Sequence, residues 1–203
     1  MSSSGASVSD RKGIQREISK GWNCIVELPP RREYEAVAER NWRIEVHEGV
    51  DFEGQHFSFP EGLFVKAQVQ WLEESLLSVR MSLSARVEGK CARCLADASL
   101  AISDDLMYLY YLRGLEVGKD TSLPSDEGYM PVEIDFWGRI LNLSDQVWES
   151  LLVLLPLKLL CREECAGLCP HCGADLNDGP CSCDPQERDP RLEILRSFSL
   201  DDV

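Results

Sequence analysis

Six of the nine cysteines in this chain fall within 23 residues, between Cys161 and Cys183. Glycine and proline stand between several of them, as in the run Cys169-Pro170-His171-Cys172-Gly173. Thiols spaced this closely either oxidise to disulfides or hold a soft metal ion, and they seldom pack as ordinary core side chains. The choice between disulfides and metal therefore decides both the cellular compartment and the way the fold is stabilised.

The rest of the chain favours metal. The first 13 residues contain no apolar stretch of the kind found in secretory signals, and the number of cysteines is odd. The densest apolar run, residues 151–155, is followed by Pro156 and is too short to span a bilayer. We expect a cytoplasmic protein without a membrane segment, in which close thiols bind metal because the compartment is reducing.

Apolar and polar residues alternate through the middle of the chain, which predicts strands with one solvated face. The last stretch of alternation reads as one long strand or as two strands broken at Asp104-Asp105. We therefore predict an antiparallel meander over residues 41–113. The alternation is clearest over residues 42–46, 65–71, 77–87 and 98–112.

The segments around this meander are less regular. Residues 1–20 are polar and serine-rich, which predicts a disordered tail. A weak alternation over residues 22–28 predicts a first strand, with Cys24 as a buried hydrophobic side chain rather than a metal ligand. The Gly, Asp, Ser and Pro content of residues 114–131 predicts a loop.

Helical signals follow. Ser144 and Asp145 predict a helix start, with Ser144 as the N-cap, and Pro156 ends the helix. Asp189-Pro190 predicts the start of a terminal helix. The fold class expected is therefore α+β: an antiparallel meander, then a helix and a cysteine-rich zinc-binding segment with a terminal helix. We divide the chain into a tail, a β domain and a C-terminal region that holds the helix and the zinc: residues 1–20, 21–135 and 136–203.

A further cysteine pair, Cys91-Ala92-Arg93-Cys94, follows the end of the strand predicted over residues 77–87. A C-x-x-C pair in a tight turn directs both thiolates to one side and supplies half of a tetrahedral site. A redox role would require the pair to open a helix, whereas the flanking segments here are predicted strands. We therefore interpret this pair as metal ligands.

The eight cysteines other than Cys24 are enough for two four-cysteine sites. Four thiolates leave no open coordination position, so we expect one or two structural zinc ions and no catalytic metal. His171 lies inside the second site, and we expect its side chain to point outward. A ribbon that joins the four cysteines between residues 161 and 172 is the alternative grouping. We predict one site from the first four cysteines and one from the last four: Cys91, Cys94, Cys161 and Cys165, then Cys169, Cys172, Cys181 and Cys183.

Charge and the lack of catalytic patterns limit the function classes. The chain carries 21 basic and 35 acidic residues, a net charge of −14 at pH 7, which repels bare phosphate backbone and favours basic partners. No pattern for nucleophilic catalysis, phosphate binding or paired carboxylates stands out, so we do not expect an enzyme. Two alternatives stay open: a thiol-switch chaperone that releases zinc on oxidation, and an RNA-processing enzyme with an open metal position.

Two separated motifs agree in order and spacing with a known family. The first is Gly89-x-Cys91-x-Arg93-Cys94-Leu95, and the second runs from Leu155-Pro156-Leu157 through the cysteines to Asp189-Pro190-Arg191. Over residues 60–200 the chain resembles the YceD family of bacterial and plastid proteins.

The resemblance implies a non-enzymatic helper in the accumulation or processing of 23S ribosomal RNA and in ribosome biogenesis. It implies as partner a basic large-subunit ribosomal protein, the pre-ribosomal large subunit, or both, with no small-molecule substrate. Because the chain is acidic, we expect its contact with RNA to be indirect or confined to a local patch.

Overall fold

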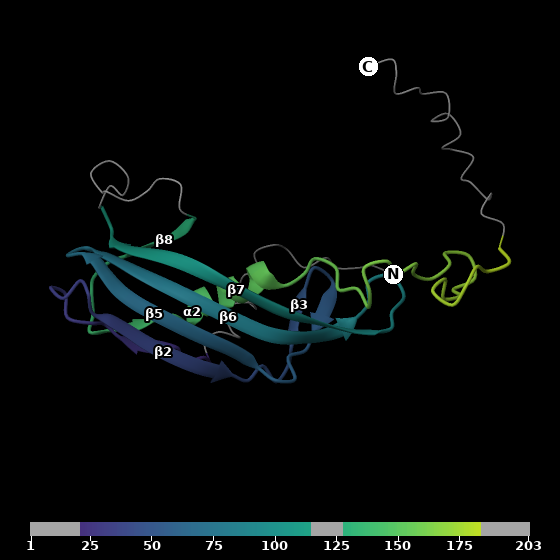
Figure 1. Ribbon diagram of the computed structural model, residues 1–203, viewed down its shortest axis with the longest axis horizontal. Helices are drawn as coiled ribbons and strands as arrows, with labels where there is room; N and C mark the ends of the chain where they lie inside the picture. The colour runs from purple at the N-terminus through teal and green to yellow at the C-terminus, as the bar shows by residue number, and fades with distance from the viewer. Residues whose placement is uncertain (1–20, 115–127, 184–203) are drawn as a thin grey trace, which may run out of the picture.

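The computed structural model describes residues 21–114 and 128–183. Its centre is a five-stranded sheet in the order β2-β5-β6-β7-β8, in which all neighbours are antiparallel except β7 and β8, which are parallel. Two small two-stranded sheets, β1-β9 and β3-β4, and helix α2 complete the described structure (Figure 1). The bounds are β1 (Ile25–Glu27), β2 (Val37–Ile44), β3 (Val50–Phe52), β4 (Gln55–Phe57), β5 (Leu63–Glu73), β6 (Leu76–Lys90), β7 (Asp97–Leu112), β8 (Tyr129–Ile134), β9 (Ile140–Asn142) and α2 (Ser144–Leu154).

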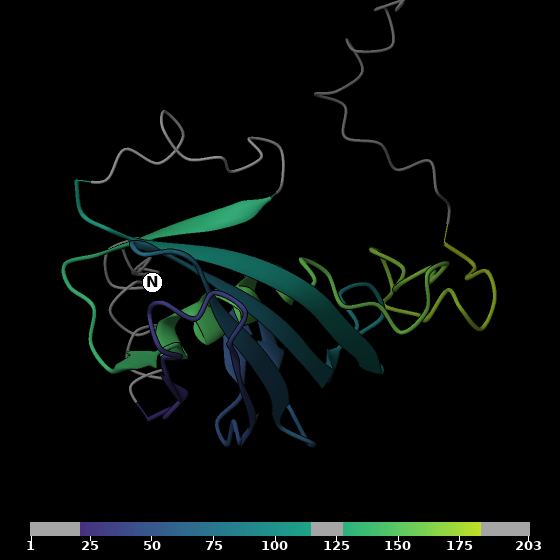
Figure 2. The same cartoon turned by 60° about the vertical axis from the view of Figure 1, so that its left-hand side comes forward.

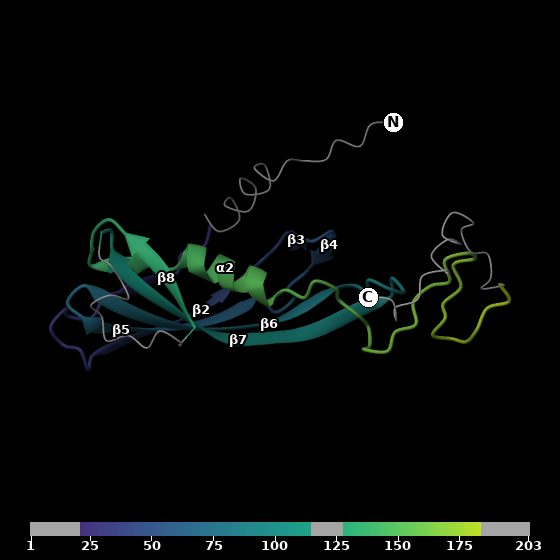
Figure 3. The ribbon, with the colours of Figure 1, turned by 90° about the horizontal axis from the view of Figure 1, so that it is seen from above.

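One face of the curved sheet is covered by α2, which lies along it (Figures 2 and 3). Successive side chains of a strand point to opposite faces, so the alternation seen in the sequence places all apolar residues of a strand on one side. In β6 the side chains of Val79, Met81 and Leu83 are buried, and in the registered pairs Val69 and Val65 of β5 face the same core. The hydrophobic core therefore lies between the sheet and α2.

A buried hydroxyl pair fixes α2 on the sheet. Tyr108 Oη lies 2.9 Å from Ser150 Oγ, which also donates to the carbonyl of Gln146 at 2.7 Å and lies 3.5 Å from the sulfur of Met81. Burial raises the pKa of Tyr108 to about 12, so the hydroxyl remains protonated and able to donate at neutral pH. The hydrogen bonds of Tyr108 and Ser150 thus fix one arrangement of α2 on the apolar face of the sheet.

The N-terminal segment is tied to the start of α2. Cys24 is fully buried, as the sequence predicted, and its amide donates to Ser144 Oγ at 3.2 Å. The same hydroxyl lies 3.0 Å from the carbonyl of Trp22, whose ring packs edge-on against Trp148 with centroids 5.7 Å apart. The prediction that Ser144 is the N-cap is wrong, because Leu143 occupies that position and the Ser144 side chain is used for this tertiary contact.

The prediction of an α+β fold is also wrong. Within residues 21–114 and 128–183 there are nine strands and one helix of 11 residues, so the fold is mostly β. The backbone pairing continues through Asp104-Asp105 although both side chains are exposed, and β7 is one strand of 16 residues. The same described ranges contain no helix with the length and apolar character needed to cross a bilayer.

Three predictions fall wholly or partly outside the described residues. The tail over residues 1–20 and the terminal helix after Asp189 are among them, as is most of the loop over residues 114–131, although Tyr129 already belongs to β8. The proposed division into a β domain and a C-terminal region stays a prediction.

Two tyrosines on β7 provide a matched test of the buried hydroxyl pair. Tyr108→Phe should lower the free energy of unfolding by about 1 kcal/mol, because Ser150 loses a buried partner. Tyr110→Phe should be neutral or stabilising, since Tyr110 Oη is buried without a hydrogen-bond partner among the described residues. Urea unfolding followed by tryptophan fluorescence measures both. Equal losses in the two variants would contradict the assignment of the hydroxyl pair.

Candidate metal centre

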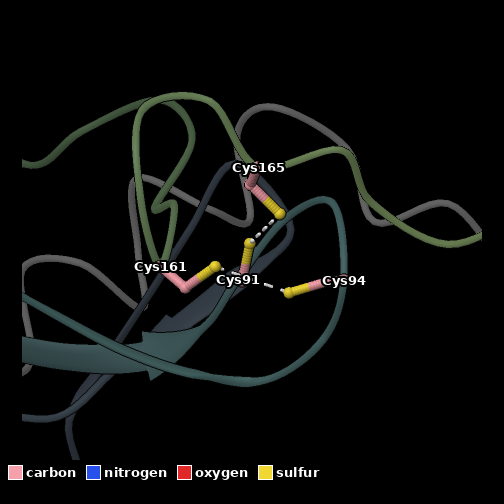
Figure 4. Close-up of side chains that lie close together, drawn as sticks. All are labelled: Cys91, Cys94, Cys161 and Cys165. Atoms are coloured by element: carbon pink, nitrogen blue, oxygen red, sulfur yellow. Dashed lines mark hydrogen bonds between the residues drawn. The ribbon is translucent and has the colours of Figure 1, made fainter. Parts of the chain in front are cut away.

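Four cysteine sulfurs from two distant parts of the chain meet beyond the end of β6 (Figure 4). Cys91 Sγ lies 3.7 Å from Cys165 Sγ, Cys94 Sγ lies 3.6 Å from Cys161 Sγ, and all four sulfurs lie within 4.8 Å of one another. A disulfide would require a sulfur–sulfur distance of about 2.0 Å. A tetrahedral ion with metal–sulfur bonds of about 2.3 Å places its sulfurs about 3.8 Å apart. The cluster therefore has the spacing of a four-thiolate metal site.

The first two cysteines lie in the turn that joins β6 to β7. The amide of Cys91 donates to the carbonyl of Ala96 at 2.8 Å, and the amide of Leu95 donates to the carbonyl of Cys91 at 3.0 Å. The amide of Arg93 points at Cys91 Sγ, 3.4 Å away. This tight turn directs both thiols to the same side and brings backbone N–H groups to the sulfur. It is the knuckle geometry that four-cysteine metal sites use.

Arg93 and Gly167 bind the second part of the chain to this turn. The Arg93 guanidinium donates to the carbonyl of Cys165 at 2.8 Å, and the carbonyl of Arg93 accepts the amide of Leu168 at 3.1 Å. Gly167 has a φ of +78°, and a Cβ there would lie 3.1 Å from the Arg93 carbonyl oxygen. The close approach of the two backbones therefore requires glycine at this position.

The thiols of this cluster differ in acidity. Burial raises the pKa of Cys91, but the backbone amides of Cys94 and Arg93 lower it more, and the pKa is about 6. The pKa of Cys161 is raised to about 12, first because its thiol is hydrogen-bonded to Cys94 and then by burial. The Asn177 side chain lowers the pKa of Cys165. Four negative charges at this spacing would repel one another, so a cation between the sulfurs would favour the thiolate form of all four.

A second cluster lies further along the chain. Its knuckle repeats the first: the amide of Cys169 donates to the carbonyl of Ala174 at 2.8 Å, and the amide of Gly173 donates to the carbonyl of Cys169 at 2.9 Å. The backbone amides of Cys172 and His171 lower the pKa of Cys169 to about 6. All four sulfurs lie within 4.8 Å of one another. The cluster consists of Cys169, Cys172, Cys181 and Cys183.

The clusters differ in exposure. In the first, all cysteines except Cys161 are buried, whereas in the second only Cys169 is buried. Asn177 connects them: its Nδ2 lies 3.4 Å from Cys165 Sγ, and its Oδ1 accepts the amide of Ala166 at 2.8 Å. The first cluster is therefore mostly buried at the tip of the hairpin, and the second is a more exposed unit attached to it.

The structure brings the eight cysteines together in the two groups of four into which the sequence analysis divided them. Cys161 and Cys165 lie on an irregular segment. His171 is exposed, as expected. The supporting roles of Arg93 and Asn177 were missed, although both residues stand in the motifs, because a hydrogen bond between distant segments leaves no local pattern.

The fold and the two clusters define a β-sheet protein whose long hairpin is closed at its tip by cysteine clusters that could hold metal ions. A family model described as "Large ribosomal RNA subunit accumulation protein YceD" matches residues 79–199, which include most of β6, all of β7 and α2, and both clusters. The chain belongs to the YceD family.

Curated relatives include uncharacterized proteins of Mycobacterium tuberculosis (strain ATCC 25618 / H37Rv) and of Mycobacterium bovis. Each is 27% identical to the chain over 117 residues, which cover 56% of this chain and 51% of the relative. The chain thus spans about half the length of the curated relatives it matches. No solved structure matches the chain.

The contact between Gly167 and Arg93 can be tested against a second glycine with similar backbone. Gly167→Ala should destabilise the protein by about 1 kcal/mol more than Gly173→Ala. Both have positive φ, +78° and +74°, but only at Gly167 does the new methyl group meet backbone. Thermal unfolding of the two variants measures the difference. A smaller loss for Gly167→Ala would mean that the two backbones do not approach as described.

Proposed function

We propose that the two clusters each hold one structural zinc ion. The sulfur spacing of the first cluster agrees with a four-thiolate site, and thiolate ligands in tetrahedral arrangement favour zinc among the common ions. The ligands would be the eight cysteines from Cys91 to Cys183, that is, all except Cys24. Four thiolates per ion leave no open position for substrate, so the metal would stabilise and not catalyse.

The ion in the first site would join the tip of the β6–β7 hairpin to the segment that follows α2. Cys91 and Cys94 come from the hairpin, and Cys161 and Cys165 come from the segment. Metal binding to residues far apart in sequence adds its binding free energy to folding, because the unfolded chain does not offer the assembled site. The ion in the second site would fold the distal segment on itself.

We further propose that the protein is a cytoplasmic, non-enzymatic ribosome assembly factor that supports the accumulation or processing of 23S ribosomal RNA. The observation that carries this proposal is the family match, which covers the hairpin, the helix and both clusters. The partner would be a basic large-subunit ribosomal protein, the pre-ribosomal large subunit, or both, with no membrane and no small-molecule substrate involved. A net charge of −14 supports a basic protein partner, with RNA contacted indirectly or at a local patch.

The two zinc sites predict a graded response to cysteine substitution. Elemental analysis of the purified protein should give two zinc ions per chain. Cys91→Ser should remove one ion and release the segment after α2 from the hairpin. The free energy of unfolding of the sheet should then fall by an amount on the order of several kcal/mol. Cys181→Ser should remove the other ion and leave the sheet almost unchanged.

Tryptophan fluorescence reports on the sheet and its helix, since Trp71 and Trp148 are buried in the core. Equal destabilisation of the sheet by both substitutions would contradict the division of roles between the two sites. A zinc content of zero would contradict the metal proposal itself.

The assembly role predicts association with immature large subunits. Tagged protein expressed in its own host should sediment with large-subunit precursors and be depleted from mature subunits. Depletion of the protein should lower the amount of 23S relative to 16S ribosomal RNA. A protein that stays at the top of the gradient, with no change in the RNA ratio, would count against the proposed function.

A further inference from the structure

The two knuckles have the same backbone and different residues at one position. After the second cysteine, the first knuckle has Leu95 with a φ of +63°, and the second has Gly173 with a φ of +74°. In each, this residue donates its amide to the carbonyl of the first cysteine, at 3.0 and 2.9 Å respectively. A positive φ is natural for glycine and strained for leucine, which has a Cβ. The first knuckle therefore carries leucine where its own geometry favours glycine.

Packing does not explain the leucine. Its side chain is 61% exposed, whereas Cys91 in the same turn is fully buried. An exposed apolar side chain contributes little by burial, so it does not offset the backbone strain within this chain. A residue that breaks a local rule without a compensating internal contact marks a position kept for function.

The surroundings of Leu95 are acidic. The turn with its flanking strand ends and the cysteine segment, residues 90–97 and 161–183, carry five carboxylates against three cationic side chains. The Arg93 guanidinium is bound to the carbonyl of Cys165, and Lys90 is paired with Asp97 at 2.7 Å. The third cation, Arg162, precedes Glu163 in the chain, and no ion pair of Glu163 or Glu164 is found among the described residues. Each cluster loaded with zinc would add a formal charge of about −2.

A hollow of about 510 Å³ opens beside the turn. Its walls include Glu88 and Asp97, with His56 and Lys90. Because Lys90 and Asp97 pair with each other, Glu88 is the carboxylate of the hollow that is left to select a partner. An exposed leucine near such a carboxylate resembles the arrangement of binding hot spots, in which an apolar anchor is surrounded by polar groups that select the partner by charge. The partner that complements it is cationic and presents an apolar surface for the leucine.

We propose that Leu95 is the apolar anchor of a docking surface for a basic protein segment, formed by the first knuckle, the hollow at Glu88 and the carboxylates of Glu163 and Glu164. The proposal rests on the proposed function for the source of that segment, a basic protein of the large ribosomal subunit. The metal clip holds the turn rigid, so the leucine is presented without a further ordering cost on binding.

The test separates binding from folding by replacing Leu95 with residues that adopt a positive φ more readily than leucine does. Zinc-loaded Leu95→Gly and Leu95→Asn should unfold at the same temperature as the wild type or higher, with unchanged zinc content. Both should bind a basic large-subunit protein at least tenfold more weakly in calorimetric titrations. The probes are the basic proteins of the large subunit, each purified separately and free of RNA.

Phe136→Ala is the matched control. Phe136 is 77% exposed and follows β8, at the opposite end of the sheet from the knuckle, so this variant should bind as the wild type does. Glu88→Gln should weaken binding by a smaller factor and reduce its dependence on salt, because it removes one charge from the hollow.

Wild-type affinity in both Leu95 variants would overturn the proposal, and so would loss of zinc or a lower unfolding temperature, which would make Leu95 a structural residue. The proposal would also be overturned if the Leu95 substitutions weakened binding to a 23S RNA fragment and left binding to the basic proteins unchanged. If the wild type sediments with large-subunit precursors but binds none of the purified proteins, the docking surface is refuted while the assembly role stands.

Discussion

The mutual repulsion of thiolates is the constraint on which the distal half of this structure depends. The sulfurs of the first cluster lie 3.6 and 3.7 Å apart in two pairs, and the sequence separates the members of each pair by about 70 residues. At this spacing all four sulfurs can carry negative charge only if a cation lies between them. The fold assembles the backbone for such an ion in advance. It provides amides aimed at the sulfur of Cys91, a guanidinium across the two segments, and a glycine where the backbones touch.

Different parts of the chain pack on the buried face of the sheet along the β6–β7 hairpin, and the interactions that hold them differ. Near its base the hairpin packs under α2 with Tyr108, Ser150 and Met81 in contact. Further along, the cover is the segment after α2, where Gln55 of β4 binds the carbonyl of Leu157 and the amide of Leu159, both at 3.0 Å. At the tip, the amide of Ala92 donates to the carbonyl of Leu159 at 2.8 Å and the cysteines begin. Along the hairpin, apolar burial is thus followed first by hydrogen bonds to the backbone of the segment after α2 and then by the cysteine cluster.

Local patterns in the sequence predicted those parts of the structure that local physics decides. Period-two alternation predicted β5, β6 and β7, and the spacing of the cysteines predicted their two groups. Other features depend on distant parts of the chain. Ser144 has the chemistry of an N-cap and yet bonds to Trp22, and the Arg93 side chain binds the carbonyl of Cys165. In each case a partner more than 60 residues away decided the outcome, and single-sequence patterns do not encode such partners.

The balance between apolar burial and sulfur ligation also explains why a protein with a substantial core has cysteines at the tip of the β6–β7 hairpin. The tip of the hairpin has little apolar area left to bury: Lys90, Ala92, Arg93 and Leu95 are exposed or half-exposed around Cys91. A long antiparallel pair without a cover on either face is only marginally stable in water. Hydrophobic contact could stabilise the tip only by making its surface apolar, and that surface would then associate with any apolar partner. Four thiolates around one ion, as proposed, would stabilise the same tip from inside and would leave its outer surface free to be acidic and selective.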